Sequence, residues 1–330
     1  MGEYSPLEVA YESAYYDNGS MTKRPVLTHT REELATALKP LTGSRALVMT
    51  MGALHSGHLE LVKQAKAHGD HVIVTIFVNP TQFAPGEDYD AYPRTLEADM
   101  DALQTVGADV VWAPSPEDAY PEPVTVSIDP GPIARVLEGK TRPTHFGGVA
   151  LVCTKVVGLV RPDVALFGEK DAQQLAMLRH VFRQLDVPVT VIGVPIVRDT
   201  DGVALSSRNR YLSDEERVRA RALNQSLTLG VEAGRAGAPA TQIIDVIRGH
   251  IEATGDIDID YIALVDDETF DILGAYGSAE LTSADSLRPA TLNQAGERAY
   301  RLLLAVKIGT TRLIDNMPFV APIEQENAGE

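Results

Sequence analysis

The chain of 330 residues contains one cysteine, no long apolar run and far fewer basic than acidic side chains. Cys153 stands alone, so no disulfide can form within the chain, and its apolar neighbours indicate a buried structural thiol. Lys and Arg number 29 against 46 Asp and Glu, and the net charge of −17 argues against nucleic acid as a main partner. Because no apolar run approaches the roughly 20 residues that cross a bilayer, we expect no membrane partner either.

Length and hydrophobic content indicate about two folded domains, at roughly 100–200 residues each. Hydrophobic residues make up 44% of the chain, which is enough to build full cores. The first residues carry Glu3, Glu8 and Glu12 without a cationic apolar leader, so we expect no secretion signal. The sequence therefore predicts a cytoplasmic protein whose residues 1–24 form a flexible N-terminal extension.

Strand-like and helix-like patterns alternate over residues 25–196. We expect strands at 45–50, 71–79, 109–112, 163–167 and 189–194, and helices at 31–39, 56–68, 94–106, 145–161 and 171–185. Short strands rich in Val and Ile between amphipathic helices predict a parallel sheet with both faces covered. In such sheets ligands bind beyond the carboxyl ends of the strands.

The pattern changes after Arg198. We expect helices at 214–234 and 241–254, followed by strands at 258–265, 278–283, 299–306 and 310–315. These elements predict a smaller α+β C-terminal domain over residues 197–316, followed by a frayed tail over 317–330.

Two histidines stand where the strand expected at 45–50 turns into a helix. Residues 50–58 read TMGALHSGH, which places His55 and His58 on one helical face. A helix N-terminus offers free N–H groups and the positive end of the helix dipole, and Gly52 allows a ligand to approach closely. We interpret the pair as a polyphosphate site. A metal site and a surface pair without function are the alternatives.

An amide-rich segment lies at the end of the strand expected at 71–79, where residues 75–83 read TIFVNPTQF. Asn79 and Gln82 are expected beside the loop that carries His55. Amides bind a carboxylate or hydroxyl without adding charge, which suits a small polar acid. The alternative is a turn in which Asn79 and Pro80 simply end the strand.

Residues 167–174, FGEKDAQQ, begin another expected helix. Gly168 permits close approach of a ligand, and Lys170 can neutralise phosphate charge. Asp171 can bind ribose hydroxyls, and Gln174 can face the same pocket. The alternative is a capped helix start with Asp171 as the N-cap residue.

Residues 204–211, ALSSRNRY, lie just after the expected domain boundary. Two hydroxyls and two guanidinium groups within five residues predict a clamp that closes over a triphosphate, although a polar linker is an alternative. Residues 140–148 (KTRPTHFGG) and 92–95 (YPRT) are further basic-polar segments that line a pocket or cap a helix.

Taken together, these motifs resemble the pantothenate synthetase family, whose members are ATP-dependent ligases that join pantoate to β-alanine. The likeness runs from about Leu27 to Asn316 and includes residues 142–149 (RPTHFGGV) and 308–316 (IGTTRLIDN). The resemblance implies a Rossmann-like doubly wound parallel sheet of the nucleotidyltransferase type with a smaller α+β C-terminal domain. Met49, Ala172 and Leu205 depart from the family's usual proline, aromatic and methionine residues.

The resemblance also implies roles for individual residues. The implied ATP site comprises Met51, Gly52, His55, His58, Gly168, Glu169, Lys170, Asp171, Val197, Leu205, Ser206, Ser207 and Arg208. His58, His55 and Lys170 would be catalytic, with His58 as proton donor. Gln82 and Gln174 would hold pantoate, and Gln82 would also meet β-alanine.

By the same resemblance, ATP enters as a substrate with Mg²⁺, and the enzyme is a homodimer. Because the chain has one cysteine and no Asp or Glu stands near the histidines in a ligating pattern, we expect the protein itself to hold no metal ion. The reaction passes through an enzyme-bound pantoyl adenylate and releases AMP and pyrophosphate. The alternatives are another nucleotidyltransferase that moves AMP to an acceptor, and a non-catalytic ATP sensor on the same fold.

Overall fold

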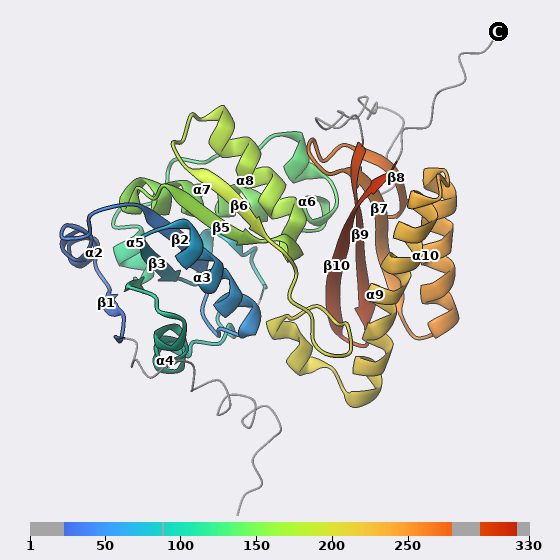
Figure 1. The fold of residues 1–330 in the computed structure, drawn as a ribbon, viewed down its shortest axis with the longest axis horizontal. Helices are drawn as coiled ribbons and strands as arrows, with labels where there is room; N and C mark the ends of the chain where they lie inside the picture. Colours follow the sequence, from blue (N-terminus) through green and yellow to red (C-terminus); the bar gives the residue numbers. More distant parts are fainter. Residues whose placement is uncertain (1–22, 88, 279–297, 322–330) are drawn as a thin grey trace, which may run out of the picture.

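The computed structural model describes residues 23–87, 89–278 and 298–321, which form two sheets with their helices (Figure 1). The six-stranded sheet has the order β1-β4-β3-β2-β5-β6, and its strands pair in parallel. The four-stranded sheet has the order β10-β9-β7-β8 and is antiparallel. The predicted fold class is confirmed. No described helix is long and apolar enough to span a membrane.

The elements of the first domain alternate along the chain. Its strands are β1 (Val26–Thr28), β2 (Arg45–Thr50), β3 (His71–Ile76), β4 (Val110–Trp112), β5 (Val164–Gly168) and β6 (Thr190–Val194). Its α-helices are α2 (Arg31–Leu38), α3 (Ser56–His68), α4 (Leu96–Val106), α5 (Pro116–Ala119), α6 (Glu138–Thr141), α7 (His145–Val160) and α8 (Ala172–Gln184). Its short 3₁₀ helices are η1 (Pro80–Gln82), η2 (Pro132–Arg135) and η3 (Glu169–Asp171).

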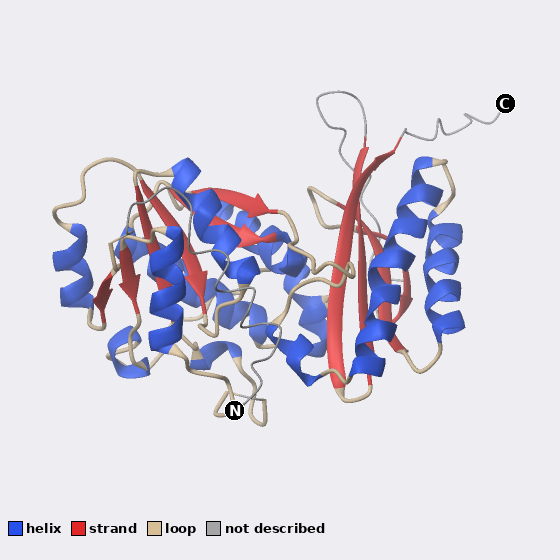
Figure 2. Ribbon diagram, turned by 60° about the horizontal axis from the view of Figure 1, so that its bottom comes forward, coloured by secondary structure: helices blue, strands red, loops and turns tan. Residues whose placement is uncertain are grey.

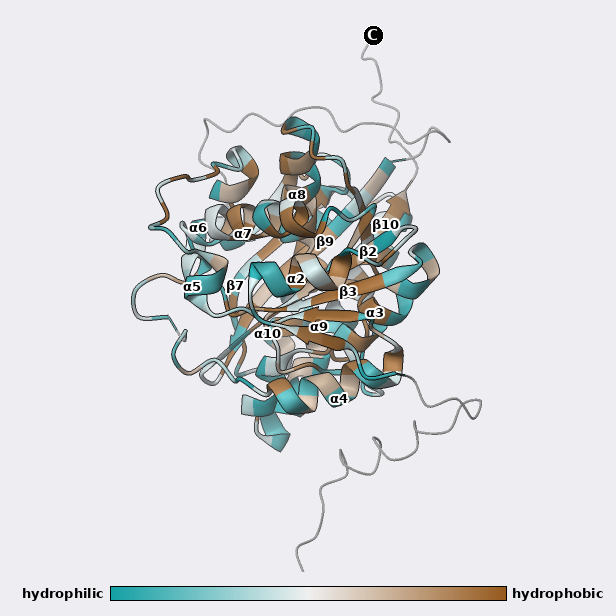
Figure 3. Cartoon of the chain, turned by 90° about the vertical axis from the view of Figure 1, so that its left-hand side faces the viewer, coloured by the Kyte–Doolittle hydropathy of each residue, from teal (hydrophilic) through white to brown (hydrophobic). Residues whose placement is uncertain are grey.

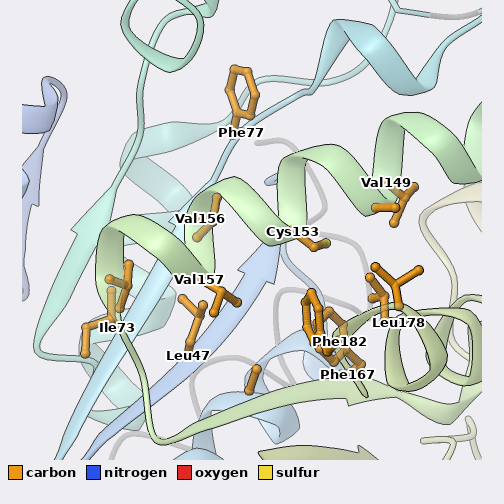
Figure 4. Packing of buried hydrophobic residues seen from close by; sticks show 14 of the residues in the cluster. Leu47, Ile73, Phe77, Val149, Cys153, Val156, Val157, Phe167, Leu178 and Phe182 are labelled. Carbon is orange, nitrogen blue, oxygen red and sulfur yellow. The ribbon is translucent and has the colours of Figure 1, made fainter. Parts of the chain in front are cut away.

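Each face of the parallel sheet has its own core. On one face α7 and α8 pack on the strands, and Figure 4 shows Cys153 and Val157 of α7 above Leu47 and Phe167. Cys153 is buried, and burial raises the pKa of its thiol to about 12, so the prediction of a structural thiol is confirmed. On the other face α3 and α4 pack on a second cluster that includes Val48. Figure 3 shows the hydrophobic residues concentrated on the strands between these helices.

The second domain follows β6 through a long connection. It consists of η4 (Ser207–Tyr211), α9 (Asp214–Arg235), α10 (Ala240–Thr254), β7 (Asp258–Asp266), β8 (Ile272–Gly277), β9 (Arg298–Ile308) and β10 (Thr311–Ala321). Alternate residues of β7 face opposite sides. Ile262 and Leu264 pack against α9 and α10, whereas Tyr261 and Ala263 pack toward the first domain. The sheet therefore stands between its own helices and the first domain (Figure 2).

The structure differs from the sequence-based expectations at three strands, and each difference has a physical reason. The strand β8 at Ile272–Gly277 was not predicted, because glycines interrupt its alternation, whereas the strand expected at 278–283 falls almost wholly on residues 279–283, which lie outside the described residues. The tail expected to fray from residue 317 continues β10 to Ala321, because an edge strand tolerates Pro318 and Phe319 is buried. The strand β1 was not predicted, because its three residues are too few to show a period.

Other expectations stay open. The flexible extension over residues 1–24 falls mostly on residues 1–22, which lie outside the described residues. Arg24 itself forms exposed ion pairs with Glu97 and Asp101 of α4. The boundary expected near residue 197 falls in the connection between β6 and η4 and remains a prediction.

A close contact between α7 and η1 gives the first testable prediction. A Cβ added at Gly148 of α7 would lie 2.2 Å from the carbonyl oxygen of Thr81. We expect Gly148→Ala to lower the free energy of unfolding by about 1–3 kcal/mol, because α7 or η1 must shift. Urea unfolding followed by circular dichroism measures the change.

Gly158→Ala in the same helix is the matched control. A Cβ there meets no atom within 4 Å, so this variant should be unchanged or more stable by up to about 1 kcal/mol. Equal effects of the two substitutions would contradict the packing argument.

Candidate active site

The two histidines lie at the first turn of α3, and their ring protons can be placed from their hydrogen bonds. The N–H of Gly57 donates to Nδ1 of His55 at 3.2 Å, and the N–H of His55 donates to Nδ1 of His58 at 3.3 Å. A ring nitrogen that accepts a hydrogen bond carries no proton, so each neutral imidazole carries its proton on Nε2. The rings lie 4.0 Å apart between centroids. They therefore form a pair of neighbouring N–H donors.

Both imidazoles are neutral near pH 7 in the free protein. Burial, reinforced by the charges of Lys170 and Arg210, lowers the pKa of His55 from 6.5 to about 4. Burial and the neighbouring His55 lower the pKa of His58 from 6.5 to about 3. The pair thus offers hydrogen bonds to an anion without placing two buried positive charges side by side.

A buried carboxylate of α4 holds the turn that leads into α3. Asp99 accepts hydrogen bonds from the N–H groups of Ala53, at 3.0 Å, and Leu54, at 2.8 Å. Gly52 and Ala53 both have positive φ angles, which the carboxylate helps to maintain. Sequence reasoning missed Asp99. Its signal is an acidic residue next to Met100 on the buried face of an amphipathic helix.

The amide cluster follows β3 as expected. Gln82 is buried in η1, where its Nε2 donates to Sδ of Met51 at 3.0 Å, so the structure brings these two predicted residues together. Asn79 caps η1 by accepting from the N–H of Thr81, and its Nδ2 donates to Oε1 of Gln82 at 3.2 Å. Because β3 already ends at Ile76, Asn79 does not end the strand but caps η1, and its side chain also orients Gln82.

The end of β5 leads into a short turn, residues 168–171, which we call the phosphate turn after the ligand that the sequence predicts for it. Nζ of Lys170 lies 3.9 Å from Oδ1 of Asp171. Asp171 precedes α8 but makes no side-chain capping hydrogen bond, so the alternative of a capped helix start lacks its defining contact. Glu169 differs from expectation, because its carboxylate accepts from Nη2 of Arg301 at 3.3 Å and so pairs with the second domain.

The Ser-rich loop after β6 lies against the start of α3. The N–H of Leu205 donates to the carbonyl oxygen of Val197 at 3.0 Å, which brings these two predicted residues together. A Cβ built at Gly57 would lie 3.9 Å from Cβ of Leu205. Ser206 caps η4 by accepting from the N–H of Arg208, and η4 begins at Ser207. The loop therefore presents hydroxyl and guanidinium groups near the histidine pair.

A cleft between the two domains collects part of the predicted site. Its walls include Lys170, Asp171, Gln174, Ser206 and Arg208. His55 and His58 are not among its lining residues, yet Lys170 and Asp171 influence the pKa values of both imidazoles. Met51, Gly52, Gln82, Gly168, Val197 and Ser207 lie on the adjoining segments rather than on the lining of the cleft.

The cleft also contains two residues of a segment that the sequence predicts either to line a pocket or to cap a helix. His145 lines it, and Nδ1 of His145 contacts the carbonyl oxygen of Gln82 at 3.1 Å. Arg142 lines it as well and pairs with Glu87 at 2.7 Å. Both residues belong to the basic-polar segment 140–148. Within residues 23–87, 89–278 and 298–321, no group of three or more His, Cys, Asp or Glu side chains could hold a metal ion.

The order of these segments matches a known family. The family model described as pantoate-beta-alanine ligase matches residues 26–318. The chain belongs to the pantoate–β-alanine ligase family. It is 45% identical to the pantothenate synthetase of Acidothermus cellulolyticus, over 91% of this chain and 93% of that protein. It is 47% identical to that of Chlorobaculum tepidum, over 83% of this chain and 90% of that protein.

Solved structures of the pantoate–β-alanine ligase family agree with the fold. The pantothenate synthetase of Thermus thermophilus superposes with a TM-score of 0.77 at 39% identity and covers 88% of this chain and 98% of its own. The Francisella tularensis ligase, complexed with β,γ-ATP and β-alanine, superposes with a TM-score of 0.68 at 30% identity, over 89% and 97%. The predicted family and the prediction of an enzyme are confirmed.

The neutral histidines predict a loss of stability in acid. Because the folded-state pKa values of about 4 and about 3 lie below 6.5, the unfolded chain binds more protons between these values. The free energy of unfolding should therefore fall as the pH falls from about 6.5. In His58→Gln this fall should be smaller than in the wild type. Urea midpoints at about pH 7 and about pH 5 measure it.

His68→Gln, at the exposed far end of α3, is the control and should follow the wild type. An identical pH dependence in the wild type and His58→Gln would show that burial of His58 does not contribute.

Proposed function

We propose that the chain ligates pantoate and β-alanine in an ATP-dependent reaction that passes through pantoyl adenylate. The observation that carries this proposal is the pair of neutral Nε2–H donors of His55 and His58 beside Lys170. Two donors and a flexible cation at a helix N-terminus suit the charge of a triphosphate. The family relationship supports the same substrates.

In the first step, a carboxylate oxygen of pantoate attacks the α-phosphorus of ATP. The bond between this phosphorus and the β-phosphate oxygen breaks, and pyrophosphate leaves with the electron pair. Negative charge grows on the phosphate oxygens, where His55, His58 and Lys170 stabilise it. A neutral His58 acts here as a hydrogen-bond donor. Gln82 and Gln174 hold the pantoate so that its carboxylate faces the phosphorus.

In the second step, the unprotonated amine of β-alanine attacks the acyl carbon of the adenylate. A C–N bond forms, the acyl C–O bond to AMP breaks, and the nitrogen loses a proton. AMP leaves far better than the oxygen of a free carboxylate, which is the reason for the first step. The loop that carries Ser206, Ser207 and Arg208 covers the intermediate and limits its hydrolysis.

The nucleotide enters as its Mg²⁺ complex. Phosphate oxygens and water satisfy most of the coordination of Mg²⁺ in such complexes, so a cage of protein ligands is not needed. Asp171 is then available for the ribose hydroxyls, as in other nucleotide sites. The homodimer implied by the family resemblance and the cytoplasmic location expected from the sequence remain predictions.

Exchange of labelled pyrophosphate into ATP tests the adenylate step. With β-alanine omitted, we expect exchange only when pantoate is present, because only the adenylate can return its AMP to pyrophosphate. Exchange without pantoate would mean that AMP is transferred to a group of the protein itself, and it would contradict the pantoyl adenylate. An absence of exchange with intact ATP binding would favour a non-catalytic sensor or an enzyme that transfers AMP to another acceptor.

Substitution of the phosphate-facing residues tests their roles. His58→Ala and Lys170→Ala should each lower kcat by on the order of a hundredfold or more, as does the loss of other preorganised donors. Steady-state kinetics measures kcat, and thermal unfolding checks that each variant is folded. A folded variant with near-wild-type kcat would remove that residue from the catalytic site.

Gln82→Ala tests the acid site. Loss of a buried hydrogen-bonding group should raise the KM for pantoate by about tenfold and change the KM for ATP much less. Gln64→Ala, on the exposed surface of α3, is the control and should leave both values unchanged. Equal increases in both KM values would indicate a general disturbance rather than contact with pantoate.

A further inference from the structure

The motif IGTTRLIDN ends in an asparagine whose role does not follow from the proposed reaction. Asn316 lies in β10 and is 1% exposed. Its Nδ2 donates to the carbonyl oxygen of Glu169 at 2.8 Å and to that of Lys170 at 2.9 Å. One side chain of the second domain thus binds two successive carbonyl groups of the phosphate turn.

The orientation of this amide is determined by its other contact. Nη1 of Arg301 lies 2.6 Å from Oδ1 of Asn316. A guanidinium group only donates hydrogen bonds, so the amide oxygen must face Arg301 and the amide nitrogen must face the turn. Arg301 is itself held by Asp267 at 2.5 Å and by Glu169 at 3.3 Å. The donors of Asn316 are therefore fixed in direction.

The turn makes few stabilising contacts of its own. It is a short 3₁₀ segment, Gly168 before it has no side chain that could cap it, and Asp171 makes no side-chain capping hydrogen bond. The hydrogen bonds of a 3₁₀ helix have poorer geometry than those of an α-helix, so contacts from outside add to the stability of such a segment. Asn316 supplies two such contacts to the backbone at Glu169 and Lys170.

We propose that Asn316 is a positioning residue, which acts on ATP through the backbone of the phosphate turn and the side chain of Lys170. This inference rests on the proposed function, in which Lys170 contacts the phosphates. The adjacent residue supports the same arrangement, because Asp315 pairs with Arg198 through two contacts of 2.7 and 2.9 Å. Arg198 begins the connection that leads to the Ser-rich loop. Two consecutive residues of β10 therefore hold the two phosphate-facing segments.

Other contacts between the domains make it possible to distinguish the positioning of the phosphate turn from the general association of the two domains. Arg312 pairs with Glu138 of α6 at 2.7 and 2.8 Å, and the hydroxyl of Tyr261 donates to Glu138 at 2.9 Å. These contacts hold the same two domains together but bind α6 rather than the phosphate turn. Tyr261→Phe, which removes one of them, is accordingly the matched control.

The experiment compares Asn316→Asp, Asn316→Ala and Tyr261→Phe in the full chain. The aspartate keeps the size of the side chain and an acceptor for Arg301, but it turns a carboxylate oxygen toward two carbonyl oxygens. We expect both Asn316 variants to weaken MgATP binding by about tenfold or more and to change the KM for pantoate less than about twofold. Calorimetry and steady-state kinetics measure these values. Tyr261→Phe should keep near-wild-type ATP affinity.

A double-mutant cycle with Lys170→Ala tests the route of the effect. If Asn316 acts through Lys170, Asn316→Ala should cost about tenfold in ATP affinity in the wild type and almost nothing in Lys170→Ala. Additive effects would overturn the proposal, as would unchanged ATP affinity in any folded Asn316 variant. Asn316→Ser, which keeps one donor, should weaken ATP binding to an intermediate degree. Its ATP affinity decides the proposal if the other variants do not fold.

The two proposals fail in different ways. Wild-type protein that binds MgATP without pantoate-dependent exchange would contradict the proposed reaction, while the ATP affinities of the variants would still decide the role of Asn316. Wild-type activity with unchanged ATP affinity in Asn316→Asp would contradict only the positioning role.

Discussion

The site depends on the parallel pairing of β2 with both β3 and β5. Thr50 pairs with Ile76 on one side, and Val48 pairs with Leu166 on the other. The carboxyl ends of these three neighbouring strands therefore lie side by side. The histidine pair, the amide cluster and the phosphate turn each follow one of these ends. Their proximity is a consequence of strand register, and the side chains need only short connections to meet.

Those three segments could be predicted because buried parallel strands read as continuous apolar runs with polar residues where they end. The strands of the second domain were harder to predict from the sequence. In β10, Pro318 suggests the end of a strand by local rules, yet it lies on the edge of the sheet, where a missing N–H donor costs little. Which strand forms an edge is decided by long-range pairing, and local sequence carries no sign of it.

The same limit explains the residues that the sequence did not reveal. Asp99 holds a turn 45 residues earlier, and Asn316 binds carbonyl groups 147 and 146 residues earlier. A buried polar side chain signals that it must have a partner, but the fold alone identifies that partner. Glu169 shows the converse, since a residue within a motif that is predicted to bind nucleotide directs its carboxylate to Arg301 of the second domain.

Charge is distributed in the free site according to the cost of burial. His55 and His58, the buried donors, are neutral, whereas the cations Arg208 and Arg210 lie at exposed positions and Lys170 retains some contact with solvent. Burying a cluster of cations without an anion would cost free energy, so neutral hydrogen-bond donors are better suited to the buried part of the free site. In the proposed reaction, the exposed cations attract the polyanion to a chain whose net charge is −17. The proposal thus assigns attraction and close binding to different groups, and it gives Asp315 and Asn316 of the second domain the task of positioning them.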